Sequence, residues 1–335
     1  MIARSLLRIK VLQLLYAYTK QDSQSLQSLD NELTESLNNS NDLFHTIFQL
    51  VVEIKNHAAY RIELGKKKNH PTEKEKNPNT RFIDNPIFAL IENSIDHVQF
   101  IETQEKKKRE IAKRKKKKES VAKEEEVFLW TESIEETPRK FYDELINSSF
   151  YKDYMNAEEV SFNDHKRLVL DIIKRIISKS ENLYTCLEEM NIYWNDDAEF
   201  VVSIIQKNIK KFKVDAPSVR LKKVFPDPEE LQFAHNLLQK TVIKRKDILD
   251  VLKANITSWD LDRIADIDLQ IMTLAIGEIL EFPNIPIKVS LDEYIDLAKA
   301  YGTSKSGEFV NGVLDKTIKA LKADNQINKA GRGLK

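Results

Sequence analysis

The chain has 335 residues, of which 41% are hydrophobic and 8% aromatic, and its 53 basic and 53 acidic side chains give a formal net charge of zero. This apolar content excludes wholesale disorder, and seven glycines and nine prolines suit helices better than an all-β protein. The single cysteine excludes an internal disulfide and fits a reducing compartment. No run approaches the roughly 18 consecutive apolar residues of a membrane span, so we expect no membrane contact.

The N-terminal segment predicts an amphipathic helix from about residue 4 to residue 20, because apolar residues recur there at 3.6-residue spacing. Arg4 and Arg8 are one turn apart on a stripe beside this apolar face, and Lys10 adds a third basic residue. These basic side chains either form a solvated helix face or bind phosphate groups. A second long helix is predicted over residues 26–64, and the two would form an N-terminal hairpin.

The composition changes between residue 65 and about residue 138. A loop with Pro71 and Pro78 precedes a short predicted helix over residues 86–101. Residues 106–118 then hold ten basic residues out of thirteen, and three glutamates follow at 124–126. This lysine block is either a solvated helix or linker, or a surface that attracts RNA phosphates without choosing a sequence. It contains no aromatic residue, so base stacking is not indicated.

Helical patterns continue through the second half of the chain. Ser161 with Asp164 predicts the start of one helix, and Pro217, Pro226 and Pro228 mark a linker. Aromatic residues at helical spacing near residues 141–154 are expected in the core rather than in a ligand box. The other helices are predicted over residues 138–155, 197–213, 229–254 and 266–281.

Local signals are dense near the C-terminus. After a break with Pro283 and Pro286, Ser290 and Glu293 form the pattern of a capping box that starts a helix. Gly302 would end this helix in a left-handed conformation. Gly312 lies inside the next helix, where it is either merely tolerated or marks another helix crossing too closely for a side chain. We expect the close crossing.

The sequence lacks the patterns of common catalytic sites. No glycine-rich phosphate loop, no His-Glu-x-x-His pair and no cysteine cluster is present, so we expect neither a cofactor nor a metal. The paired acids Asp260 with Asp262 and Asp266 with Asp268 stand at the start of a predicted helix, where carboxylates favourably meet the helix dipole. These observations favour a binding protein over an enzyme.

Five segments resemble, in order and register over about 57 residues, the C-terminal half of the NusB family of transcription antitermination factors. They are residues 259–264 (Trp-Asp-Leu-Asp-Arg-Ile), 268–280, 285–289 (Ile-Pro-Ile-Lys-Val), 297–299 (Leu-Ala-Lys) and 309–315 (Phe-Val-Asn-Gly-Val-Leu-Asp). Residues 11–16 also resemble the end of the family's N-terminal arginine-rich motif, although the basic cluster before them is thinner than usual. The family is typically shorter, so the middle of the chain looks like an insertion.

The resemblance implies an all-α fold of two packed helical bundles, here with a largely helical, charged insertion. We divide the chain into an N-terminal basic helix and hairpin (1–64), a charged insertion with short helices (65–158), a C-terminal helical bundle (159–325) and a basic tail (326–335). The stretch without acids before Asp22 would also suit an organelle transit peptide. Because these residues fit the family's first helix, we expect a cytoplasmic protein.

The resemblance also implies a function. NusB proteins bind the boxA element of rRNA leader transcripts together with a small-subunit ribosomal protein, NusE. The complex joins the elongating RNA polymerase with other Nus factors and supports rRNA transcription and maturation. By position, Arg4, Arg8 and Lys10 match the arginine-rich residues that meet phosphates. Lys305 matches a position near the RNA that is often acidic in the family, and Phe309 matches an aromatic that either stacks on RNA or anchors the core.

Tyr16 and Asp268 match positions on the face that meets the ribosomal protein.

Two alternative functions remain. The family fold also occurs as an accessory domain of rRNA cytosine methyltransferases, but no strand–helix alternation is present here to form a methyl-donor domain. The other alternative is a non-catalytic helical scaffold, or a generic RNA-binding protein in ribosome biogenesis.

Overall fold

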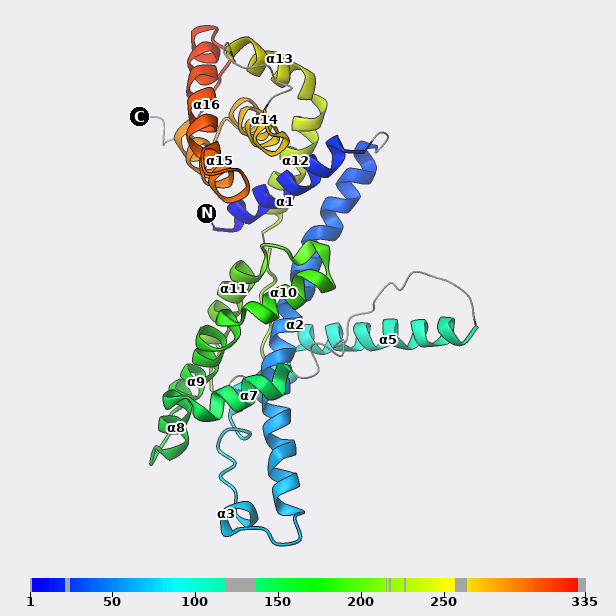
Figure 1. Cartoon of the computed structure of the whole chain (residues 1–335), viewed down its shortest axis with the longest axis vertical. Coiled ribbons are helices and arrows are strands. Elements are labelled where there is room, and N and C mark those ends of the chain that lie inside the picture. Colours follow the sequence, from blue (N-terminus) through cyan, green and yellow to red (C-terminus); the bar gives the residue numbers. More distant parts are fainter. Residues whose placement is uncertain are drawn as a thin grey trace. The chain divides into compact units, whose positions relative to one another are not determined.

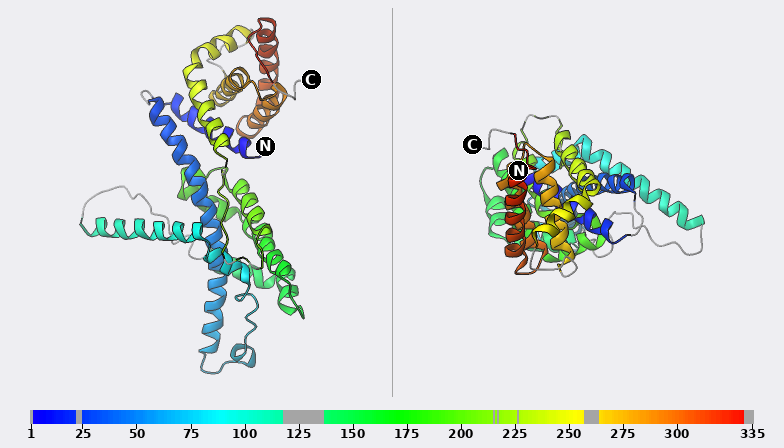
Figure 2. Two further views of the ribbon diagram at one scale, coloured as in Figure 1. Left: turned by 180° about the vertical axis from the view of Figure 1, so that it is seen from behind. Right: turned by 90° about the horizontal axis from the view of Figure 1, so that it is seen from above.

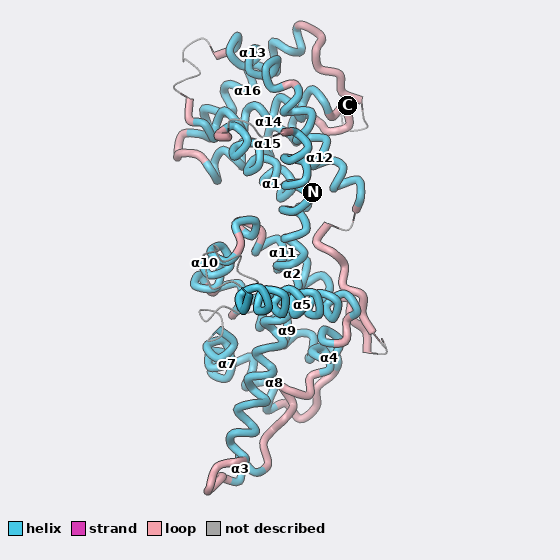
Figure 3. The backbone as a smooth tube through the Cα atoms, turned by 90° about the vertical axis from the view of Figure 1, so that its right-hand side faces the viewer, coloured by secondary structure: helices cyan, strands magenta, loops and turns pink. Residues whose placement is uncertain are grey.

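The computed structural model describes residues 2–21, 25–117, 137–214, 216, 218–225, 227–256 and 264–330. These residues form helices and loops without any strand, as Figure 3 shows, which confirms the predicted all-α class. The described chain divides into two compact units, the first made of residues 1–37 with 227–335 and the second of residues 38–226. The domains expected from the sequence are consecutive stretches of chain, whereas each of these units is defined by its internal contacts. The expected domain ranges stay a prediction.

The first unit is built around α14 (Asp266–Glu281). Its residues from Ile271 to Ile279 are buried on every side, which is the pattern of a helix enclosed by neighbours rather than one lying on a surface. Figure 1 shows other helices of this unit around it, and the view from behind in Figure 2 shows the same arrangement. The surrounding helices are α1 (Ile2–Thr19), α12 (Pro228–Ile243), α13 (Arg245–Asn255), α15 (Ile287–Tyr301) and α16 (Ser306–Ala323).

The close helix crossing in this unit lies at Gly277 on α14. A Cβ atom there would come within 2.6 Å of Thr241 Oγ1 on α12. The expectation of a close crossing at Gly312 is wrong, because a Cβ atom there would meet nothing within 4 Å. The expectation of a left-handed Gly302 is also wrong, since its φ is −95°. Gly302 leaves room instead for Ser306, whose Cβ would lie 2.4 Å from an added side-chain carbon.

The predicted capping box at Ser290 is likewise wrong. Helix α15 begins at Ile287 after Pro286, so Ser290 lies inside the helix rather than at its start. Its side chain is fully buried, and its hydroxyl donates to Glu278 at 2.7 Å instead of to a backbone group of its own helix. Ser290 therefore bonds to a residue of another helix instead of capping its own helix.

The second unit is organised by the long helix α2 (Leu26–Lys66), whose first residues belong to the first unit. Beyond residue 37, α2 buries an apolar stripe that includes Phe44, Ile47, Phe48 and Val51. The unit continues with α3 (Glu73–Lys76), α4 (Pro86–Glu92), α5 (Ile95–Lys117), α7 (Thr137–Asn147), α8 (Ser149–Asn156), α9 (Phe162–Arg175), η1 (Ile177–Lys179), α10 (Glu181–Met190), η2 (Ile192–Trp194) and α11 (Ala198–Lys210).

Three predicted helices are each divided into two. The segment 86–101 breaks at Asn93 and Ser94 between α4 and α5, and the segment 138–155 breaks at Ser148, which caps α8. The segment 229–254 breaks at Lys244 between α12 and α13. The predicted start at Ser161 is confirmed, since its hydroxyl and the Asp164 side chain form a reciprocal capping box at α9.

Candidate nucleic-acid interface

Arg8, predicted to meet RNA phosphates, is buried in the first unit, where it pairs with Glu278 on α14. Its Nε lies 2.8 Å from Glu278 Oε2 and its Nη2 lies 2.9 Å from Oε1, so the pair is bidentate. The side chains are 2% and 0% exposed. Burial works to lower the pKa of Arg8, but the hydrogen bonds and charge of Glu278 outweigh it and raise that pKa above its ordinary value.

Two hydroxyl groups of α15 complete the surroundings of Glu278. Ser290 Oγ donates to Oε1 at 2.7 Å, and Tyr294 OH donates to Oε2 at 3.0 Å. Tyr294 is fully buried, and this burial with the neighbouring carboxylate raises its pKa well above the ordinary value. Each carboxylate oxygen therefore accepts one bond from Arg8 and one from α15, so that α1, α14 and α15 meet at one satisfied ion pair.

The rim of this ion pair is more exposed. Arg8 Nη1 lies 3.3 Å from Glu293 Oε2, and Glu293 is 22% exposed. Ser5 Oγ donates to the same oxygen at 2.7 Å. The guanidinium carbons of Arg4 and Arg8 lie 5.2 and 5.3 Å from the centre of the Phe233 ring on α12, within cation–π range. The arrangement uses Arg8 to dock α1 and leaves Arg4 half-buried at the edge.

The other predicted residues of α1 differ in exposure. Lys10 is fully buried, whereas Tyr16 is 37% exposed. Lys20 Nζ lies 5.6 Å from the centre of the Tyr16 ring and also pairs with Asp266 in the first turn of α14. The C-terminal end of α1 therefore lies beside the N-terminal end of α14.

Asp268 also lies in that first turn of α14 and faces the start of α16. It is 5% exposed, and its Oδ2 accepts a hydrogen bond from Ser306 Oγ at 2.8 Å. Its Oδ1 is buried without a hydrogen-bond partner among the described residues. The expected placement of Asp266 and Asp268 at a helix start is confirmed, while Asp260 and Asp262 lie outside the described residues.

Lys305 and Phe309 lie one turn apart at the start of α16. Lys305 is exposed and precedes the first residue of the helix, and Phe309 is half-buried. The backbone N–H of Phe309 donates to the Lys305 carbonyl at 3.1 Å, which fixes this turn. Residues four apart share one side of a helix, so the cation and the ring are presented together. A phosphate and a neighbouring base are the chemical groups that such a pair can bind.

The structure therefore brings Arg4 together with Arg8, and Lys305 with Phe309, and it uses Arg8 within the fold. The RNA and partner roles of all seven predicted residues stay predictions. Sequence reasoning missed Glu278 and Phe233. Glu278 carried a signal, because it is the only carboxylate in the largely apolar run 271–280, and a buried carboxylate needs a cation or hydrogen-bond donors. Phe233 carried none that distinguishes it from other core aromatics.

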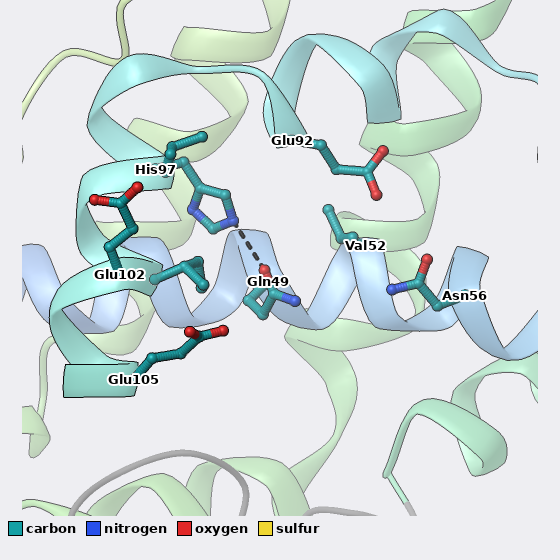
Figure 4. Close-up of a pocket in the computed structure, with 9 residues that line it drawn as sticks. Gln49, Val52, Asn56, Glu92, His97, Glu102 and Glu105 are labelled. Atoms are coloured by element: carbon teal, nitrogen blue, oxygen red, sulfur yellow. Dashed lines mark hydrogen bonds between the residues drawn. The ribbon is translucent and has the colours of Figure 1, made fainter. Parts of the chain in front are cut away.

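The second unit holds an open pocket of about 250 Å³ between α2, α4 and α5. Figure 4 shows His97 bonded to Gln49 across it, with Glu92, Glu102 and Glu105 around its edge. None of the seven predicted residues lines this pocket. Within the described ranges, no cluster of three histidine, cysteine or acidic side chains could hold a metal ion. No described helix is both long and apolar enough to cross a membrane.

Comparisons with known proteins point to one family. The family model described as NusB family matches residues 198–319. A transcription antitermination protein NusB of Salinibacter ruber is 39% identical over 108 residues, covering 32% of this chain and 68% of that protein. The protein of the same name from Chloroherpeton thalassium is 36% identical over 128 residues, covering 38% of this chain and 61% of its own. The one from Alkaliphilus oremlandii is 37% identical over 92 residues, covering 28% and 67%.

Among solved structures, NusB of T. maritima is 28% identical and covers 41% of this chain and 85% of its own, with a TM-score of 0.27. The sequence matches to the NusB proteins and to the family model identify the family. Of the first two segments of the resemblance, residues 259–263 lie outside the described residues, and residues 268–280 lie within α14.

Proposed function

Because the chain belongs to the NusB family of transcription antitermination factors, we propose that it binds a boxA-type, single-stranded rRNA leader together with the ribosomal protein NusE. In this proposal the complex joins the elongating RNA polymerase with other Nus factors in the cytoplasm and supports rRNA transcription and maturation. The observation that carries the proposal is the match of residues 198–319, which includes α14, α15 and most of α16.

The proposal assigns phosphate contact to Arg4 and Lys305 and base stacking to Phe309. Arg4 is half-buried beside Phe233, and Lys305 is exposed at the start of α16. The contact with the Phe233 ring orders the Arg4 side chain, which lowers the entropy lost when it binds phosphate. Phe309 is half-buried at the start of α16, and in this proposal its ring stacks on a splayed base.

Arg8 has an indirect role in this proposal. Its ion pair with Glu278 fixes α1 against α14 and so positions Arg4. A phosphate contact by Arg8 or by the buried Lys10 would require α1 to move away from its neighbours. Tyr16 and Asp268 lie at and beside the N-terminal end of α14 and are proposed to face NusE. Because the Oδ1 of Asp268 is buried, a bond from the partner to this acceptor would require the start of α14 or α16 to shift.

The proposal is tested by neutralising its cations in the full chain. Replacing Arg4 and Lys305 with glutamine should reduce the salt dependence of boxA binding, because each phosphate contact to single-stranded RNA contributes about 0.7 to the slope of log K against log salt. Two lost contacts predict a slope smaller by roughly 1.4. The matched control replaces Lys319 and Lys322, which are exposed near the other end of α16.

Phe309→Ala separates stacking from a core role. Loss of one stacked base should weaken RNA binding by about 1–3 kcal/mol while the protein's thermal midpoint is unchanged. An equal loss of stability would assign Phe309 to the core. If the double variant of Arg4 and Lys305 and its control have the same slope as the parent protein, these cations do not meet RNA and their assignment is wrong.

A further inference from the structure

The second unit carries the strongest charge concentration of the chain, in the lysine block of residues 106–118. Ten basic residues and one acidic residue give this block a formal charge of +9, while the whole chain is neutral. The remaining 322 residues hold 43 basic and 52 acidic side chains and therefore carry −9. A polyanion approaching the chain is thus attracted to the block and repelled, on average, by the rest.

Most of this block lies on the C-terminal half of α5 (Ile95–Lys117). The first half of α5 is anchored by the buried side chains of His97 and Gln104. After Gln104, every residue from Glu105 to Glu110 is exposed. Figure 1 shows α5 leaving the side of α2, and Figure 2 shows the same from behind. The thirteen helical residues 105–117 form an arm about 20 Å long, at 1.5 Å per residue.

Acidic side chains lie near two of the basic residues at the base of this arm. Glu105 Oε2 lies 3.1 Å from Arg109 Nη2, in a pair whose side chains are 51% and 75% exposed. Burial raises the pKa of Asp42 on α2, and the charge of Lys107 offsets part of that rise. Further along, Arg109, Lys113 and Lys117 follow one another at four-residue spacing, where like charges destabilise a helix. A bound polyanion would relieve this repulsion.

The composition of the arm selects the kind of polyanion. Residues 105–117 contain only Ile111 and Ala112 as apolar residues, so the arm lacks the apolar face by which an amphipathic helix inserts into a membrane surface. It contains no aromatic residue on which a base could stack. Ammonium groups in this density match the regular phosphates of a nucleic-acid backbone, which they bind by releasing counterions.

We propose that the C-terminal half of α5 is a second RNA-binding site, which holds the phosphate backbone without sequence preference. It lies outside residues 198–319, which match the family. The choice of RNA as the polyanion rests on the proposed function of the chain. The arm increases affinity for any RNA, whereas discrimination of boxA belongs to the first unit and NusE.

The test replaces Lys106, Lys107, Lys108 and Arg109 with glutamine in the full chain. The matched control replaces Lys207, Lys210, Lys211 and Lys213, four exposed lysines of the same unit, and removes the same charge. Binding of a labelled single-stranded RNA of scrambled sequence is measured at several salt concentrations. If all four arm residues meet phosphates, the slope of log K against log salt becomes smaller by about 3 in the arm variant and stays unchanged in the control.

A circular-dichroism titration supplies an independent readout. Scrambled RNA should increase the helical signal of the parent protein, and this increase should be reduced in the arm variant. Equal losses of slope in both variants would show an effect of net charge alone and overturn the proposal. An unchanged RNA slope with lost binding to phosphatidylserine vesicles would assign the arm to a membrane and also overturn it.

The two proposals fail separately. The arm variant should keep the ratio of boxA to scrambled affinity measured with NusE present, because the arm does not read sequence. Loss of that ratio in the arm variant would contradict a sequence-independent arm. A ratio of one in the parent protein with NusE present would contradict the boxA proposal. It would not contradict the proposal that the arm binds RNA without sequence preference.

Discussion

The buried pair of Arg8 and Glu278 allows a quantitative prediction about how the first unit is held together. Glu278→Gln removes the negative charge while keeping the size of the side chain. Arg8 then remains buried with Glu293 as its nearby carboxylate, at 3.3 Å and 22% exposed. Breaking one partner of a buried ion pair costs about 3–5 kcal/mol, and we expect a loss in that range.

The physical reason is the geometry of the pair. Two charge-assisted bonds of 2.8 and 2.9 Å offset the desolvation of both groups, and the bonds from Ser290 and Tyr294 satisfy the remaining carboxylate lone pairs. Arg8→Met should be destabilising for the converse reason, because it leaves the Glu278 charge with two hydroxyl donors. The double variant Arg8→Met with Glu278→Leu should cost less than the sum of the single variants, since neither charge is then left alone.

Denaturant unfolding of the full chain, followed by circular dichroism, measures each free energy of unfolding. The control is Asp266→Asn, which breaks the exposed pair with Lys20, whose side chains are 57% and 48% exposed. Because water screens that pair, we expect a loss of at most about 1 kcal/mol, from the interaction of the carboxylate with the helix dipole. The reasoning is refuted if Glu278→Gln lowers the free energy of unfolding no more than the control does. It is also refuted if the loss in the double variant equals the sum of the losses in the single variants.

Two further predictions use the same assay. Gly277→Ala should destabilise the protein by about 1–3 kcal/mol because the added Cβ would meet Thr241. Gly312→Ala should stabilise it by up to roughly 1 kcal/mol, because alanine has the higher helix propensity and nothing lies within 4 Å of the added Cβ. Equal effects of the two variants would contradict a close helix crossing at Gly277. Burial and mutual repulsion lower the pKa of His45 to about 3, and burial lowers that of His97 to about 4. The unfolded chain therefore binds more protons below about pH 6.5, and stability should fall by about 2 kcal/mol per histidine at about pH 5, a loss that is absent when both are replaced.

The hydrogen bonds around His97 explain why these histidines stay neutral. Gln49 Nε2 donates to Glu53 at 2.6 Å, which turns Gln49 Oε1 toward His97 Nε2 at 2.9 Å and assigns the proton of His97 to that nitrogen. His97 Nδ1 then accepts from His45 Nδ1 at 3.4 Å. A second proton on His97 would face the His45 donor. The sequence shows two separate histidines and does not reveal that α2 and α5 bring them together.

Sequence patterns predicted the helices well where the signal is local. Ser161 and Asp164 start α9 as expected, because both partners of the capping box lie within one turn. Ser290 carried the same pattern but donates to Glu278, twelve residues earlier in the chain, and a local rule contains no information about that partner. Gly312 failed for a related reason, since a glycine's neighbours across a helix interface are set by packing that sequence spacing does not specify.

The candidate site was predictable in part. The motif at residues 309–315 indicated the family, and the family match is confirmed. The N-terminal arginines illustrate what remained hidden, because Arg4 and Arg8 look equivalent on a helical wheel. One turn of helix separates a half-exposed cation from one that is 2% exposed, and the difference depends on where Glu278 approaches α1.

The most direct test of the account is the ratio of boxA to scrambled RNA affinity, measured for the parent protein with and without purified NusE at several salt concentrations. We expect tighter, sequence-dependent binding only with NusE present, on top of a salt-dependent affinity for both RNAs. Equal affinity for the two RNAs under all conditions would contradict the boxA function and leave a generic polyanion binder. Absence of RNA binding would instead support a helical scaffold.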